Sequence, residues 1–156
     1  MSKFISILFI FFFIGCNASD TLIDPIKPQF ETMSFDAVQK QLIIEKDLPN
    51  HLQIILSHWF DEKVKIDGFD GDLIFKISNY TQEISSIDGG KRADLSLYFN
   101  LILNKPILSK KKSIKGVVSS YGELKGDFSI KEFETVIANT QTNLVQLLSK
   151  DLKSKI

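Results

Sequence analysis

Residues 93–104 read Ala-Asp-Leu-Ser-Leu-Tyr-Phe-Asn-Leu-Ile-Leu-Asn, and this stretch decides the fold of the chain. Apolar side chains occupy every second position from Ala93 to Leu103, which is the period of a β-strand with one buried face. Turn-forming sequences bound the stretch, with Asp88-Gly89-Gly90 before it and Asn104-Lys105-Pro106 after it. The sequence therefore predicts a long strand in a sheet that is covered on one side.

Three further strand patterns accompany this stretch. Apolar and polar residues alternate through residues 73–78, and another run of strand-forming residues extends from Ile114 to Tyr121. Because the connections are short, an antiparallel meander is the economical arrangement of these strands. A first strand is expected within Phe35 to Glu45, which ends in the apolar run Leu42-Ile43-Ile44.

Two amphipathic helices complete the pattern. The first begins at Pro49-Asn50, because proline suits the first helical turn, and it stops before Gly68. The second follows Ser129-Ile130-Lys131-Glu132, which fits a capping box. Their apolar faces are formed by Leu52, Ile55, Leu56, Trp59, Phe60 and Val64 in the first and by Phe133, Val136, Ile137, Thr140, Leu144, Leu147, Leu148 and Leu152 in the second. The order β-α-β-β-β-α predicts an α+β domain with a four-stranded, mainly antiparallel sheet and two helices on one face.

The charge of the chain is balanced. The chain contains 19 Lys and Arg residues and 19 Asp and Glu residues. Its 156 residues are enough for one domain. Nucleic-acid binding depends on many cations that neutralise phosphates, so this balance argues against a nucleic-acid partner.

The first fifteen residues have the pattern of an export signal. Lys3 precedes an apolar run from Phe4 to Ile14, and Gly15 follows as a small residue before the expected cleavage site. A helix of that length rises about 16 Å, roughly half of a bilayer's hydrocarbon core, so it is too short to span a membrane. The single cysteine, Cys16, comes directly after the signal and rules out an intramolecular disulfide.

The residues Phe13-Ile14-Gly15-Cys16 resemble the lipobox of bacterial lipoprotein precursors. The resemblance implies cleavage between Gly15 and Cys16, and lipid attachment to the Cys16 thiol. Two or three acyl chains anchor a protein essentially permanently, so it also implies a membrane partner. The residue after the cysteine is Asn17 and not Asp, which in the family goes with the outer membrane and favours a periplasm-facing location there.

No catalytic or metal-binding pattern stands out. His51 and His58 lie two turns apart on one helix, and we expect them to be structural because no set of carboxylate or thiol partners converges on them. Asp67, Asp70 and Asp72 lack the alternation of a calcium loop, so turn chemistry explains them better. We therefore expect a protein that is not an enzyme and has no cofactor and no metal.

A group of lysines is the one candidate contact surface. Lys105, Lys110, Lys111, Lys112 and Lys115 gather at a predicted hairpin tip that also carries Ile107 and Leu108. One interpretation is a solvated loop or a strand edge protected by charge. The other is a cationic and apolar surface that contacts an anionic lipid or a partner.

The whole pattern resembles the LPS-assembly lipoprotein family. The similar features are the amphipathic strand Leu95–Leu103, a strand near Gly116–Tyr121 that contains Ser-Tyr, and a long final helix. The chain is also similar in style to uncharacterised alphaproteobacterial lipoproteins and to auxiliary lipoproteins of ABC-type lipid transporters.

The first resemblance implies a non-enzymatic accessory or assembly subunit in cell-envelope biogenesis, with lipopolysaccharide transport as one form of that role and a β-barrel as partner. The alternative is a substrate- or lipid-binding auxiliary lipoprotein of an ABC-type lipid transport system, with a transporter component as partner. The expected organisation is a signal peptide over residues 1–15, a lipidated cysteine and flexible tether over 16–32, and a periplasmic domain over 33–156. Pro25 and Pro28 motivate the tether, because they interrupt a segment with little apolar periodicity.

Overall fold

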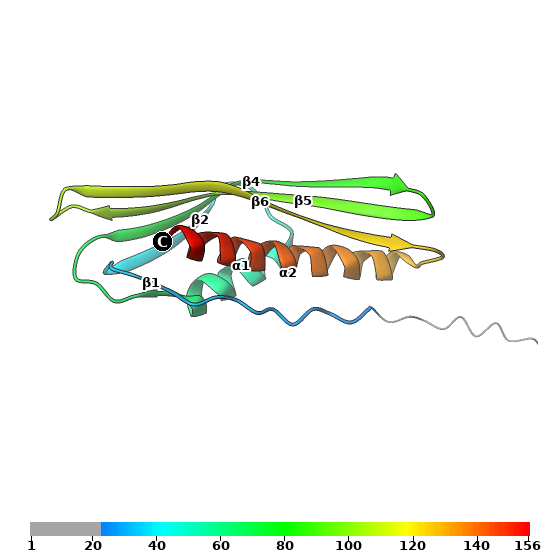
Figure 1. Cartoon of the computed structure of the whole chain (residues 1–156), viewed down its shortest axis with the longest axis horizontal. Coiled ribbons are helices and arrows are strands. Elements are labelled where there is room, and N and C mark those ends of the chain that lie inside the picture. The colour runs from blue at the N-terminus through cyan, green and yellow to red at the C-terminus, as the bar shows by residue number, and fades with distance from the viewer. Residues whose placement is uncertain (1–22) are drawn as a thin grey trace, which may run out of the picture.

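The structure, a computed structural model, describes residues 23–156 and contains one main sheet (Figure 1). Its strand order is β2-β4-β5-β6, and the last three strands form an antiparallel meander while β2 runs parallel to β4. The strands are β2 (Gln39–Ile44), β4 (Asp72–Ile87), β5 (Gly90–Lys105) and β6 (Lys110–Lys125). The predicted α+β class and the mainly antiparallel four-stranded sheet are confirmed.

Both helices, α1 (Asn50–Lys63) and α2 (Ile130–Lys155), lie on the same face of this sheet (Figure 1). The predicted capping box begins α2: the Ser129 hydroxyl accepts from the Glu132 amide at 3.2 Å, and the Ser129 amide donates to the Glu132 carboxylate at 2.6 Å. No helix among residues 23–156 is long and apolar enough to cross a membrane.

The expected extent of the first helix was wrong at its end. The helix stops at Lys63, and Val64, which we expected on its apolar face, begins the short strand β3 (Val64–Ile66). This strand pairs in parallel with β1 (Met33–Phe35), and Val64 is buried there. The β-branched residues Val64 and Ile66 favour the extended conformation once a partner strand is available.

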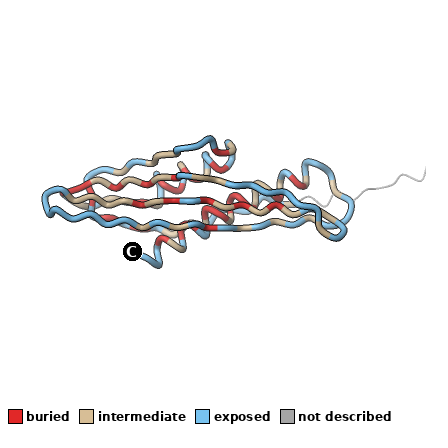
Figure 2. The backbone as a smooth tube through the Cα atoms, turned by 90° about the horizontal axis from the view of Figure 1, so that it is seen from above, coloured by how far each residue is buried: buried red, intermediate tan, exposed pale blue. Residues whose placement is uncertain are grey.

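Aromatic and aliphatic side chains fill the space between the sheet and the helices. Figure 2 shows the buried positions in red along the strands and helices. Trp59 contacts Phe75 edge to face, with ring centroids 5.3 Å apart, and Phe75 lies 5.9 Å from Phe99. The alternating residues of β5 from Ala93 to Leu101 are buried, as the sequence period predicted. This core holds α1 and α2 against the sheet and so fixes the positions of the residues at both ends of the molecule.

The segment between residues 24 and 31 runs along α2. Asn139 holds its start, because its side chain accepts from the Ile26 amide at 2.9 Å and donates to the Asp24 carbonyl at 3.1 Å. Buried Ser149 holds its end through both backbone groups of Glu31, at 3.0 and 3.2 Å. The described part of the predicted tether is therefore attached to the domain, and we call residues 24–31 the strap.

Candidate functional site

The predicted lysines lie at and next to the hairpin that joins β5 to β6. Lys105 ends β5 and Lys110 begins β6, and these two residues face each other across the hairpin. Ser109 closes the turn with a positive φ of 49°, and its amide donates to the Pro106 carbonyl at 3.1 Å. We call residues 105–112 the lysine tip.

Lys105 differs from the other lysines of the tip because it has an acidic partner. Its ammonium group forms an ion pair with Asp36, and its side chain is only 12% exposed. Asp36 follows β1, so this ion pair joins the tip to the β1–β3 ribbon. Lys105 therefore acts mainly to hold the tip in place, and its charge is compensated.

Lys110, Lys111 and Lys112 are exposed and form no ion pair within residues 23–156. Alternation along β6 puts Lys110 and Lys112 on the helix side of the sheet and Lys111 on the outer side. Lys115 lies further along β6 on the outer side, opposite Asn100. The structure thus brings three uncompensated lysines together at the tip, with Lys115 nearby on the outer face.

An apolar cavity of about 130 Å³ lies directly beside these lysines. It is bounded by β1, by the helix side of β5 and β6, and by the C-terminal residue, and is lined by Ser34, Phe35, Asp36, Leu101, Leu103, Lys112, Ile114 and Ile156. A wider, open depression next to it is lined by all four tip lysines together with Leu108. Ile107 at the turn is 73% exposed. The site therefore combines an apolar floor with a rim of positive charge.

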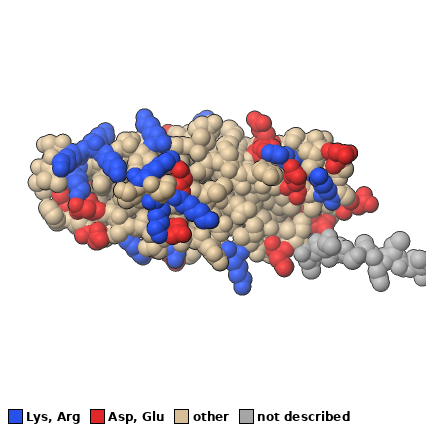
Figure 3. All heavy atoms as spheres, viewed as in Figure 1, with Lys and Arg blue, Asp and Glu red and all other residues tan. Residues whose placement is uncertain are grey.

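The surface charge is distributed unevenly along the long axis. In the view of Figure 3, Lys and Arg side chains gather over the half of the molecule that holds the lysine tip and the end of α2. Asp and Glu side chains are more prominent near the opposite end, where the strap begins (Figures 1 and 3). An anionic ligand would therefore be attracted to the tip end.

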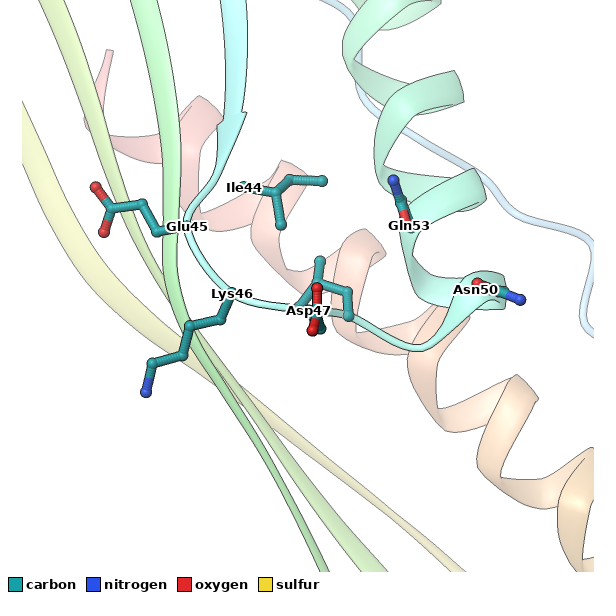
Figure 4. Close-up of a pocket in the computed structure, with 7 residues that line it drawn as sticks. Ile44, Glu45, Lys46, Asp47, Asn50 and Gln53 are labelled. Atoms are coloured by element: carbon teal, nitrogen blue, oxygen red, sulfur yellow. The ribbon is translucent and has the colours of Figure 1, made fainter.

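A second open pocket, of about 810 Å³, lies where β2 ends and the chain turns into α1 (Figure 4). Glu45 and Lys46 point away from α1, and Asn50 points outward, so their polar groups do not converge (Figure 4). Because catalysis needs groups that meet at one reacting atom, this pocket lacks the arrangement of an active site.

The histidines and aspartates do not form a site in the described part of the chain. His51 lies 3.4 Å from the Thr142 hydroxyl, and His58 lies 3.4 Å from Glu62 on an exposed helix surface. Asp67 accepts from the Ser34 hydroxyl at 2.8 Å, as part of the turn chemistry around β3. Within residues 23–156, no three His, Cys, Asp or Glu side chains are grouped so that they could hold a metal ion.

Gly15 and Cys16 lie outside the described residues. Sequence reasoning missed Asp36 and Ile156, which complete the cavity, and it missed the contact between the strap and α2. Asp36 lies 69 positions from Lys105, and neither residue belongs to a local pattern that would reveal the pair.

The fold defines a class of small α+β proteins in which two helices cover one face of a four-stranded sheet. No protein-family model matches the chain, and no characterised protein matches it in sequence. The minor lipoprotein from Acinetobacter baumannii has a similar structure, with a TM-score of 0.56, 11% identity, and coverage of 75% of this chain and 93% of that one. At this identity the likeness shows a shared fold, and the fold is therefore one that a bacterial lipoprotein uses.

Two other solved structures resemble the chain more distantly. The rare lipoprotein B from Shewanella oneidensis has a TM-score of 0.41 and 12% identity, with 76% of this chain and 99% of that one covered. The lipoprotein B from Nitrosomonas europaea has the same TM-score and identity, with coverage of 83% and 90%.

Proposed function

We propose that the chain is an outer-membrane lipoprotein, anchored through Cys16, that serves as a non-enzymatic accessory subunit in cell-envelope biogenesis. The lysine tip is its contact site for an anionic lipid or for a partner that carries one, and lipopolysaccharide transport is the finer form of this proposal. The observation that carries it is the apolar cavity beside three uncompensated lysines.

The chemistry of this site suits an amphiphile. An acyl chain or another apolar group would cover the half-buried residues Leu103 and Ile114, while a phosphate would meet Lys110 and Lys112 at the rim. Basic residues near an anionic lipid surface contribute about 1 kcal/mol each, and the attraction falls as salt screens it.

The strap supports a particular orientation of this site. It runs from Asn139 towards Ser149 on α2, and Ile156 at the helix end borders the cavity. The rise of an α-helix separates Asn139 from Ile156 by about 25 Å. In the proposed arrangement the lysine tip lies at the end of the molecule away from the start of the strap, so it is presented to components that approach from the periplasm.

Binding to vesicles tests the tip. The variant with Lys110, Lys111 and Lys112 replaced by Ser is compared with wild type on phosphatidylcholine vesicles with and without phosphatidylglycerol. We expect binding to the anionic vesicles to weaken by up to roughly a hundredfold, from about 1 kcal/mol per lysine.

A matched control replaces Lys27, Lys125 and Lys131, three exposed lysines away from the tip, by Ser. The two triple variants carry the same net charge, so equal binding by both would assign the effect to overall charge and would refute a specific site.

The anchor has its own test. Mass spectrometry of the N-terminal peptide from the membrane-extracted protein should find a chain that begins at Cys16 with a diacylglyceryl group on its thiol. The Cys16→Ser variant should be released from the membrane fraction. An unmodified Cys16 in the wild-type protein would refute the anchor.

A further inference from the structure

The two outer edges of the sheet differ in how they are protected. β6 forms one edge, and five of its 16 residues are lysines, which discourage the addition of another strand. β2 covers the other edge only as far as Ile77, because it pairs with Asp72–Ile77 of β4. Beyond a bulge at Ser78, the remainder of β4 pairs with β5 on one side, and no strand of the described chain pairs with its other side.

This free edge, Asn79–Ile87, has the composition of a strand that accepts a partner. Its sequence is Asn-Tyr-Thr-Gln-Glu-Ile-Ser-Ser-Ile, with Glu83 as its single charge and with no lysine or proline. Residues 81–86 are all exposed. A long exposed edge that lacks lysine and proline offers unpaired backbone groups to another strand.

We propose that residues 79–85 of the free edge pair with the same residues of a second copy of this chain, antiparallel, with Gln82 of both copies facing each other on the two-fold axis. This register sets Glu83 opposite Thr81 of the second copy and keeps like charges apart. A shift of the axis to Glu83 would place two carboxylates directly opposite each other, which is destabilising.

The side chains of the edge fit this register. Tyr80 and Ile84 face the helix side of the sheet, since they lie opposite the buried residues Leu97 and Ala93. Ile84 is 52% exposed in the single chain. In the proposed dimer Ile84 of one copy lies opposite Tyr80 of the other, and such pairs of an aromatic with a β-branched residue stabilise sheets.

The open pocket at the end of β2 provides room for the end of the partner strand. In this register Ile87 and Asp88 of the second copy would reach Ile77 and Lys76, where β2 already pairs with β4, so the end of the second copy's hairpin must leave the sheet beside this pocket. Lys46 projects there over the sheet (Figure 4), and its ammonium group donates to the Asn79 side chain at 3.1 Å. This pairing does not depend on the proposed lipid anchor.

Charge substitutions at position 81 test the register. In the full chain, solubilised in detergent, Thr81→Lys should strengthen the dimer because it creates two pairs with Glu83, and Thr81→Glu should weaken it. From the size of cross-strand pairs, each change should alter the dimer dissociation constant by roughly two- to thirtyfold, measured by analytical ultracentrifugation.

The control variants are Ser119→Lys and Ser119→Glu, which change an exposed residue on the outer face of β6. Changes at Thr81 that have the same effect as those at Ser119, or a wild-type chain that stays monomeric at every concentration, would overturn the proposal.

Cysteine cross-linking gives an independent readout in membranes. Gln82→Cys should form a disulfide-linked homodimer, whereas Ser119→Cys and wild type, with Cys16 as its only cysteine, should not. Cross-linking of Gln82→Cys to a different protein, or to none, would refute pairing with a second copy.

Discussion

Gly122→Ala is the substitution that most directly probes how α2 is seated on the sheet. Gly122 lies on β6, and a Cβ atom there would come within 3.0 Å of the Thr140 hydroxyl and of a Val136 methyl group, closer than real Cβ atoms approach. Thr140 and Val136 are both buried on α2, at 2% and 8% exposure, so neither side chain has room to move aside. The helix must shift instead.

The expected loss follows from the size of this clash. Overpacking a filled core costs about 1–3 kcal/mol. Replacing glycine by alanine in a strand regains about 0.5–1 kcal/mol of backbone entropy. We therefore expect a net loss of about 1–2 kcal/mol in the free energy of unfolding, measured by urea denaturation.

A double-mutant cycle with Thr140→Ala separates this clash from other causes. That change removes the hydroxyl that lies closest to the new methyl group, together with its hydrogen bond to the Val136 carbonyl at 2.7 Å. The double variant should be more stable than the sum of the single losses predicts, by at least about 0.5 kcal/mol. Additive losses, or a neutral Gly122→Ala, would refute this account of how α2 contacts β6.

Three further predictions concern contacts that attach separate parts of the chain. Ser149→Ala removes both hydrogen bonds to the Glu31 backbone and should cost about 1–3 kcal/mol, with faster amide exchange over residues 24–31; unchanged exchange would show that the strap is held elsewhere. Lys40→Met keeps the apolar stem but removes three hydrogen bonds from the ammonium group to carbonyls around the end of α1, at 2.6–2.9 Å. Urea denaturation should show a loss of about 1–3 kcal/mol in the free energy of unfolding. Equal stability would contradict a role for Lys40 in holding the end of α1. The hydrogen bond and charge of Lys153 hold the pKa of Glu31 below its usual 4.5. The stability that this ion pair adds to the fold is therefore present above pH 4.5 and is lost as the pH falls through the lowered pKa. In an NMR titration Lys153→Ala should move the Glu31 midpoint up towards 4.5, and an unmoved midpoint would contradict the ion pair.

The parts of the fold that the sequence predicted are those with a local period. Apolar and polar residues alternate in β5 because the helices cover one face of the sheet along Ala93–Leu101 and the other face is partly exposed to solvent. β4 was expected only through residues 73–78, yet it continues to Ile87. Residues 81–86 are exposed and not covered by a helix, so no apolar period marks this half as a strand. Its pairing with β5 creates the strand, and pairing depends on residues that are distant in sequence.

The lysine tip was predicted as a group, but the different states of its members were not. Lys105 and Lys110 look alike in the sequence, yet only Lys105 meets an acidic partner, and that partner follows the short strand β1. A three-residue strand such as β1 pairs only with another three-residue strand, β3, and leaves no period to detect. Ion pairs and cavities that such short elements complete can be identified only from the tertiary structure.

Affinity purification of the lipidated protein from its own membrane tests the central proposal of an envelope accessory subunit most directly. The wild-type chain should recover a component of an envelope assembly or lipid-transport complex, such as a β-barrel or an ABC transporter subunit. The variant with Lys110, Lys111 and Lys112 replaced by Ser should recover less of it than the control with Lys27, Lys125 and Lys131 replaced. Recovery of no envelope component by the wild-type chain would contradict the proposed role.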